Sequence, residues 1–227
     1  MEPLQTVSVI DALAERLREH VLDGDIPAGA AVAETDIAAR FGVSRPTAKS
    51  AILTLVHRGL LRRDAHRSAC VPALTRDEVF DIYQARIPLE LAAVKALAER
   101  AAVNDAVRDA FGELGGLSDD VPASRFIAAD LRAHQALIDQ CSSTRLRRLY
   151  GLLLDEIHLC MIQSRYALGR DRIAREHAAV LERIAAGDTA GATEAMCEHL
   201  QNAARDLADA IELPRSAASG GSSSSSR

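Results

Sequence analysis

Asp130, His134, His177 and His199 are the residues of this chain whose types and spacing best suit a metal ion. Asp130 and His134 are four residues apart, so they share one face of a helix. His177 lies ten residues before Gly187 and His199 lies twelve residues after it. At about 1.5 Å per residue, both histidines are about 15–18 Å from a turn at Gly187, level with each other in an antiparallel helix pair. One carboxylate and three imidazoles suit a divalent transition metal, zinc foremost, with nickel or manganese as alternatives.

Two other interpretations of this cluster stay open at the level of the sequence. A histidine on a mixed helix face is more often a packing or surface residue than a ligand, which leaves a metal-free helical interaction module. Alternatively, a metal with an open position activates water, and the protein is a metal-dependent hydrolase. The chain has no HExxH motif and no glycine-rich phosphate loop. We therefore expect no enzymatic activity and assign no catalytic residue.

The segments that must position the cluster are helical. After Thr75 the chain consists of long stretches rich in Ala, Leu, Arg and Glu, with almost no strand signal. Glycines and prolines divide them into six expected helices, at about 76–101, 104–115, 122–140, 143–167, 170–186 and 189–212. Pro88 lies inside the first of them, where proline can kink a helix. Short links between long helices favour an antiparallel six-helix bundle.

The residues before Thr75 have a different pattern. Apolar residues at spacings of three and four predict a first helix over about 7–23, followed by helices at about 34–41 and 45–57. Two short extended stretches, 60–63 and 69–71, are expected to form a hairpin. We place the domain boundary at residues 72–76, which gives an N-terminal domain over 1–75 and a helical domain over 76–214. The Gly/Ser-rich segment 215–227 is expected to be a disordered tail.

The second and third of these helices have helix–turn–helix spacing. Gly42 allows the tight turn between them, and Ser44 is placed to cap the third helix, with Pro46 in its first turn. Ala38 is small enough for a close approach of the two helices, while Val43, Ala48 and Ile52 are expected to face inward. The third helix then presents its N-terminal end to the major groove. An ordinary three-helix packing unit is the alternative.

The side chains expected to contact DNA lie on these helices and at the tip of the hairpin, which would form a wing. Arg45 is suited to a guanine edge or a phosphate, and small hydroxyl side chains suit phosphate or base contacts. The full set is Arg40, Ser44, Arg45, Thr47, Lys49, Ser50, His66, Arg67 and Ser68.

Charge supports this interpretation. The whole chain carries a net charge of −5, yet residues 40–67 hold seven basic side chains against one acidic, a local balance of +6. A basic segment on an acidic protein is typical of a nucleic-acid footprint. The four cysteines lack CxxC spacing, which indicates reduced thiols in a cytoplasmic protein. No apolar run approaches the ~20 residues of a membrane span, and the N-terminus does not resemble a signal peptide.

Residues 7–75 resemble the winged helix–turn–helix of the GntR transcription regulators. The similarity rests on the Pro27-x-Gly29 turn, on Gly42-Val43-Ser44-Arg45 and on Gly59-Leu60-Leu61. The chain departs from the family at Lys49-Ser50, where Arg-Glu is frequent, and at Ser68, where the wing usually has glycine. The resemblance implies a bacterial DNA-binding regulator, and the departures concern which operator it reads.

Residues 76–212 resemble the all-helical FCD effector domain of the FadR branch of that family. The similarity rests on Tyr83-Gln-Ala-Arg86-x-x-Leu-Glu90, Asp130-x3-His134, Glu176-His177 and Gly187-Asp188 followed by His199-Leu200. Six helices indicate the shorter VanR-like subgroup. The resemblance implies that the aspartate and three histidines hold a metal beside a small carboxylate effector, and that the domain forms a homodimer.

The same resemblance implies a role for Arg86 in the effector pocket. From the sequence alone, an intrahelical ion pair with Glu90 is an equally good interpretation. The expected protein is a ligand-responsive regulator that binds double-stranded operator DNA. Repression relieved by a small organic acid is the usual outcome in the family, and activation is the alternative.

Overall fold

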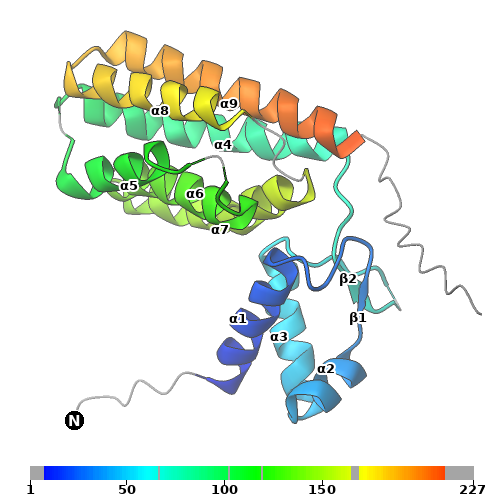
Figure 1. Ribbon diagram of the computed structural model, residues 1–227. Helices are drawn as coiled ribbons and strands as arrows, with labels where there is room; N and C mark the ends of the chain where they lie inside the picture. The colour runs from blue at the N-terminus through cyan, green and yellow to red at the C-terminus, as the bar shows by residue number, and fades with distance from the viewer. Residues whose placement is uncertain (1–7, 66, 102, 119, 165–168, 213–227) are drawn as a thin grey trace, which may run out of the picture.

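The computed structural model describes residues 8–65, 67–101, 103–118, 120–164 and 169–212. They form an N-terminal head and a C-terminal helical bundle (Figure 1). The head contains α1 (Val9–Leu22), β1 (Ala31–Val32), α2 (Glu34–Phe41), α3 (Arg45–His57) and β2 (Ala69–Cys70). The bundle contains α4 (Arg76–Ala98), α5 (Asp105–Gly115), α6 (Ala123–Asp139), α7 (Thr144–Gln163), α8 (Arg170–Ala185) and α9 (Thr189–Glu212). The mainly helical fold and its two-part architecture agree with the sequence analysis.

The head folds around its helix–turn–helix. Gly42 has a φ of 64° and caps the C-terminus of α2, a left-handed conformation that glycine adopts without strain. The side chain of Ser44 accepts a hydrogen bond from the Thr47 backbone N–H and thereby begins α3. Ala48 and Ile52 are buried against α1 and α2 as expected, whereas Val43 is only partly buried. The turn therefore leaves the N-terminal end of α3 in solvent.

The expected hairpin is wrong in one respect. The strand that pairs with β2 is β1, with Ala31 opposite Cys70 and Val32 opposite Ala69. The stretch at 60–63 contributes only a single bridge, from Arg62 to Cys70. Because β1 has two residues, it carries no alternating pattern that the sequence could reveal. The described residues between Arg62 and Cys70 belong to the segment that is expected to form the wing.

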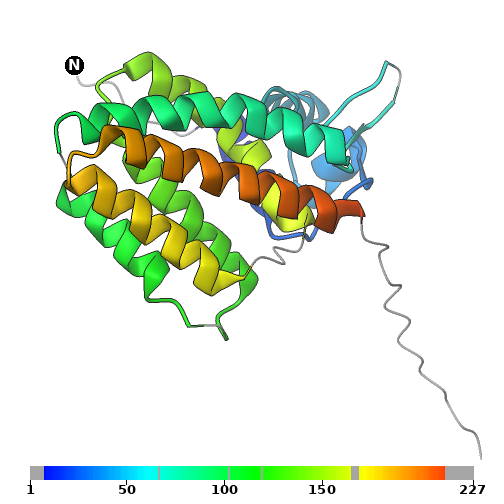
Figure 2. The ribbon, with the colours of Figure 1, turned by 90° about the horizontal axis from the view of Figure 1, so that it is seen from above.

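The bundle begins at a capping box. The Thr75 hydroxyl and the Glu78 side chain exchange hydrogen bonds with each other's backbone N–H groups and start α4. α4 continues through the exposed Pro88, so the proline does not end the helix. α9 lies between α4 and α8, as the view from above shows (Figure 2). Along this arrangement the inner faces of α4, α6, α8 and α9 meet in the interior of the bundle.

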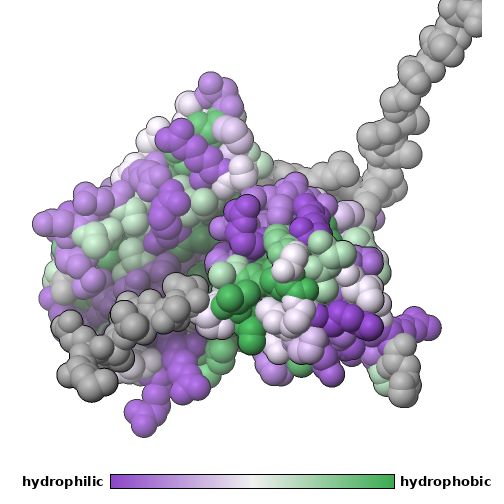
Figure 3. All heavy atoms as spheres, turned by 90° about the horizontal axis from the view of Figure 1, so that it is seen from below, coloured by the Kyte–Doolittle hydropathy of each residue, from purple (hydrophilic) through white to green (hydrophobic). Residues whose placement is uncertain are grey.

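Helix α7 joins the two parts. The Arg18 Nε of α1 donates to the Asp155 Oδ1 of α7 at 2.6 Å. The side-chain amide of Gln163 bonds to the backbone of Pro72 and Leu74, which connect the head to the bundle. From below, the molecule shows mostly hydrophilic side chains around smaller hydrophobic areas (Figure 3). Among the described residues, no helix combines the length and apolar character required to cross a membrane.

Candidate metal centre and DNA-binding surface

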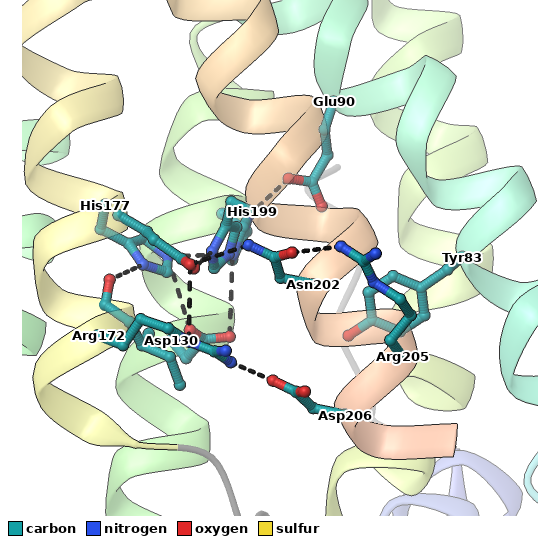
Figure 4. A network of polar contacts seen from close by, with 12 residues as sticks. Tyr83, Glu90, Asp130, Arg172, His177, His199, Asn202, Arg205 and Asp206 are labelled. Carbon is teal, nitrogen blue, oxygen red and sulfur yellow. Dashed lines mark hydrogen bonds and ion pairs between the residues drawn. The ribbon is translucent and has the colours of Figure 1, made fainter. Parts of the chain in front are cut away.

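Three helices bring the four predicted ligands together. Asp130 and His134 project from α6, His177 from α8 and His199 from α9. All four residues are buried, with exposed fractions between 0 and 4%. One ligand atom from each lies within 4.8 Å of the others, and Figure 4 shows Asp130, His177 and His199 inside the bundle. The structure therefore brings together the four side chains that the spacing argument grouped.

Each histidine is oriented by a hydrogen bond on its Nδ1 atom. The Nδ1 of His177 faces the carbonyl oxygen of Ile173 at 2.8 Å. The Nδ1 of His134 faces Glu90 Oε2 at 2.5 Å, and the Nδ1 of His199 faces Glu176 Oε2 at 2.7 Å. A carbonyl or carboxylate oxygen only accepts, so Nδ1 is the donor in each ring and the proton position follows from these partners. The three Nε2 atoms consequently carry lone pairs.

These lone pairs converge on one another. His134 Nε2 lies 3.1 Å from His177 Nε2 and 3.4 Å from His199 Nε2. Asp130 Oδ1 is 3.5 Å from His177 Nε2 and accepts no hydrogen bond from the described residues. Four electron-rich atoms in a buried space repel one another unless a cation lies between them. Zinc–nitrogen bonds of about 2.0–2.1 Å at near-tetrahedral angles separate two nitrogens by roughly 3.3 Å, so these residues fit a metal ion.

Burial keeps two of the histidines, His134 and His177, in the form that binds metal. Burial lowers the pKa of His134, and the nearby Glu90 only partly offsets it. Burial, together with the two neighbouring histidines, lowers the pKa of His177 well below its ordinary value. Burial alone would raise the pKa of Glu90, yet Arg86 and His134 hold it well below its usual range. At His134 and His177 the site thus combines imidazoles of lowered pKa with an ionised carboxylate behind one of them.

Glu90 belongs to a second buried group that the sequence analysis only partly anticipated. Its Oε1 accepts from Arg86 Nε at 2.5 Å and from the Tyr150 hydroxyl at 3.0 Å. Arg86 also donates from Nη1 to the Tyr83 hydroxyl at 3.0 Å, and its buried Nη2 has no hydrogen-bond partner among the described residues. The predicted pair of Arg86 with Glu90 is therefore present. One nitrogen of Arg86 remains available beside a small cavity lined also by Asp130 and His199.

The predicted DNA-contacting residues lie around α3 and the wing. Arg45 and Lys49 are exposed on α3, and Thr47 and Ser50 are partly exposed. Arg45, Arg67 and Ser68 line a surface hollow of about 340 Å³ between α3 and the wing. Arg63 lines the same hollow and forms an ion pair with Glu34 at 2.9 Å.

Three further predicted contacts differ in their settings. Ser44 is exposed, but its hydroxyl is already engaged with Thr47 at the cap of α3. Arg40 is exposed on α2, with its guanidinium over the Phe41 ring. His66 lies outside the described residues.

Comparison with known protein families decides the identity. Residues 81–202 match the FCD domain, and residues 10–71 match the bacterial regulatory proteins of the gntR family. The chain belongs to the FCD-containing GntR family. It is a DNA-binding transcriptional regulator, as the sequence analysis predicted. The hydrolase alternative has no support, because the members of this family are regulators and not enzymes.

One curated relative and one solved structure match nearly nine-tenths of the chain, and a second structure matches about three-fifths of it. The chain is 25% identical over 201 residues to the uncharacterized HTH-type transcriptional regulator YdhC of Bacillus subtilis (strain 168), covering 87% of this chain and 90% of YdhC. A GntR structure from Rhodococcus sp. RHA1 superposes with a TM-score of 0.75 at 24% identity, covering 88% of this chain and 98% of that one. The zinc-bound FCD domain of TM0439 superposes with a TM-score of 0.51 at 24% identity, covering 62% and 99%. The VanR-like subgroup stays a prediction.

Sequence reasoning missed the roles of Glu90, Tyr150 and Glu176 in this FCD domain. Glu90 and Glu176 stand in the quoted motifs, but their hydrogen bonds to His134 and His199 span 44 and 23 residues. Tyr150 occurs in no motif and reaches Glu90 over 60 residues. The only sequence signal for such a role was an acidic residue on an otherwise apolar helix face. A carboxylate at a buried position is stable there when it has a hydrogen-bonding or charged partner.

Proposed function

We propose that this protein is a bacterial repressor that binds operator DNA as a homodimer and releases it when a small organic acid reaches a metal in the FCD domain. A regulator of this kind acts in the cytoplasm, where it meets the chromosome. Two-fold symmetry is proposed because a single recognition helix reads too few base pairs for useful specificity.

The observation that carries the metal part of the proposal is the convergence of three Nε2 lone pairs and Asp130 Oδ1 in a buried space. Zinc is the metal proposed, with nickel or manganese as alternatives, because neutral imidazoles and one carboxylate suit all three. The zinc-bound FCD domain of TM0439 supports the choice by analogy of fold. A metal at these four residues would take a carboxylate oxygen as a fifth ligand, because such metals can expand from four to five coordination.

Arg86 is proposed as the second anchor of the acid. Its Nη2 is buried and lacks a hydrogen-bond partner among the described residues, and it lines the cavity that includes Asp130 and His199. A guanidinium nitrogen in such a place donates strongly to a carboxylate. Glu90, Ile173 and Glu176 hold the histidine rings in position while the acid binds.

On the DNA side, Arg45 is proposed to contact a base edge or a phosphate, together with Arg40, Ser44, Thr47, Lys49, Ser50, His66, Arg67 and Ser68. The exposure of Arg45 and its position at the N-terminal end of α3 support this assignment. Effector binding changes transcription only if it favours one arrangement of the two heads over another.

The test is metal content and metal-dependent ligand response of the full-length protein. Protein purified without chelator is expected to contain about one equivalent of metal per chain by elemental mass spectrometry. His177→Ala is expected to lose that metal and the response to small carboxylates while it retains DNA binding. His20→Ala, which removes a histidine of the head, is the matched control and should retain both. Wild-type protein that neither contains nor takes up zinc, nickel or manganese would exclude the proposed sensor.

A further inference from the structure

Two cavities lie along the seam between α4 and α9. The inner cavity reaches the metal cluster and is lined by nine residues: Tyr83, Arg86, Asp130, Met161, Arg172, Ile173, Glu176, His199 and Ala203. The outer groove is lined by Phe80, Tyr83, Gln84, Ile87, Gln201, Ala204 and Arg205. Tyr83 is common to both linings, and we take its side chain as the partition between them.

The two cavities differ greatly in size. The inner cavity has a volume of about 10 Å³ and the outer groove about 390 Å³. A single water molecule requires about 10–15 Å³ on this measure. An organic acid of four or more heavy atoms therefore does not fit behind Tyr83 as the helices stand. Its binding requires the lining of the inner cavity to move, and Tyr83 is the lining residue that the two cavities share.

The contacts of Tyr83 allow such a movement. Arg86 holds its hydroxyl with one hydrogen bond of 3.0 Å, and the guanidinium carbon lies 5.1 Å from the ring centre. A carboxylate that enters the inner cavity offers Arg86 a charged acceptor in place of a neutral phenol, and charge-assisted hydrogen bonds are roughly twice as strong. A carboxylate that accepts from the unpartnered Nη2 with one oxygen and from Nη1 with the other thus replaces the contact that keeps Tyr83 in position.

The outer groove has a lining suited to binding the part of the acid that lies beyond its carboxylate. Phe80, Ile87 and Ala204 give it an apolar lining, with Arg205 at its polar edge. Arg205 donates to Asn202, whose amide donates to Glu176, the partner of His199 (Figure 4). The groove and the metal cluster are therefore joined by hydrogen bonds along α9 as well as by Tyr83.

We propose that the effector is a carboxylic acid with an extended apolar body, and that Tyr83 determines how large that body can be. The carboxylate lies at Arg86 and the metal ligands, and the body passes Tyr83 into the outer groove. This inference rests on the proposed function and adds the chemical class of the effector. It also assigns Phe80, Ile87 and Ala204, which lie outside the metal cluster, to effector recognition.

The experiment compares two probe acids on the zinc-loaded, full-length protein by isothermal titration calorimetry. Acetate occupies only the anchor, whereas 3-phenylpropanoate extends into the groove. The longer acid is expected to bind about tenfold more tightly, the effect of burying one aromatic ring. Gln84→Trp fills the groove and should remove that advantage while acetate binding stays unchanged. Ala85→Trp, an exposed neighbour outside the groove lining, is the matched control and should change neither affinity.

Tyr83→Phe tests the partition separately. It keeps the ring but removes the hydroxyl that Arg86 bonds, so both acids should bind a few-fold more tightly. Circular dichroism and the melting temperature of the metal-free variant establish that it folds. Unchanged or weaker binding of both acids by the folded variant would overturn the role of Tyr83.

The remaining outcomes separate this inference from the proposed function. If acetate binds and 3-phenylpropanoate binds no more tightly, the extended-acid inference is wrong and the metal-anchored sensor stands. An equal loss of affinity for 3-phenylpropanoate in Gln84→Trp and Ala85→Trp would also overturn the role of the outer groove. If neither acid binds the zinc-loaded protein, both proposals fail together.

Discussion

The head and the bundle present their functional side chains in opposite ways. Arg45 and Lys49 of the head are exposed at the end of α3, while the candidate ligands of the bundle are almost completely buried. Exposed cationic side chains suit a polyanion that arrives with its own counterions. They are already at the surface, so they can take the place of those counterions when the polyanion binds. Buried lone pairs suit a cation that stays, because only a bound charge relieves their mutual repulsion.

This difference predicts how each part tolerates change. A substitution at the exposed end of α3 should alter binding and leave the free energy of unfolding nearly unchanged, as is usual for surface sites. A substitution in the buried cluster changes packing, hydrogen bonding and metal affinity together, because His134 contacts Glu90 and both other histidines. Measurements that separate binding from stability therefore test the comparison directly.

Removal of a metal ligand should have the largest effect. Zinc at a thousand times its dissociation constant is expected to stabilise the wild-type protein by about 4 kcal/mol. His134→Ala should abolish that stabilisation, because it removes the central ligand of the cluster. Thermal unfolding with zinc and with a chelator measures the difference between the two states. A variant that zinc stabilises as strongly as it does the wild type would show that His134 is not a ligand.

The second prediction concerns the exposed face of the head. Arg45→Ala should weaken binding to the operator by about 1–3 kcal/mol, the range for one base-reading side chain. Its urea unfolding curve should superpose on that of the wild type, because Arg45 is exposed. Arg100→Ala, which removes an exposed arginine just beyond the end of α4 whose Nε donates to the Ala96 carbonyl oxygen, is the matched control for charge. Tight operator binding by Arg45→Ala would reject the recognition-helix assignment.

The sequence revealed the helices well and the short strands poorly. All six bundle helices were predicted within about four residues of their ends, because each carries a long apolar period and is closed by glycine, proline or a capping residue. The two-residue strand β1 escaped prediction and was replaced by a pairing of 60–63 with 69–71. Strands this short are defined by their partner across the sheet and not by their own pattern.

The candidate site shows the same limit at the level of side chains. Spacing placed His177 and His199 level with each other because both lie on helices joined at one turn, where distance along the axis follows from residue number. Spacing did not place Glu90 behind His134, because that contact depends on how α4 and α6 are rotated against each other. Rotation of packed helices is set by side-chain interdigitation over the whole interface, which no short motif encodes.

The third prediction tests the buried partner that the sequence missed. Glu90→Gln keeps the shape of the side chain but removes the charge that orients His134 and pairs with Arg86. Loss of such an outer partner typically lowers metal affinity by about 10- to 100-fold. Zinc titration against a competing chelator measures this change. Glu113→Gln removes an exposed carboxylate that pairs with Arg132 and should leave zinc affinity unchanged; an equal loss in both variants would contradict a specific role for Glu90.

The smallest expected effect lies between the two parts, at His158 on α7. Burial, together with the neighbouring Arg18, lowers the pKa of this histidine to about 4, against the opposing effect of Asp155 and Asp23. Below a pH of about 6.5 the unfolded chain binds a proton that the folded protein does not take up until about pH 4. The free energy of unfolding should therefore fall as the pH decreases through this window.

Substitution of His158 isolates that contribution. Between pH 7 and pH 5, the free energy of unfolding should fall by about 1–2 kcal/mol less for His158→Gln than for the wild type. Urea unfolding of metal-free protein measures this difference. The comparison of slopes matters because His134 and His177 also have lowered pKa values and contribute to both proteins alike. His57→Gln, at an exposed position of α3, controls for the loss of a histidine and should retain the wild-type slope. Parallel pH profiles for wild type and His158→Gln would mean that α7 meets the head through a contact that water reaches freely. The exposed character of the head would then extend to its boundary with the buried bundle.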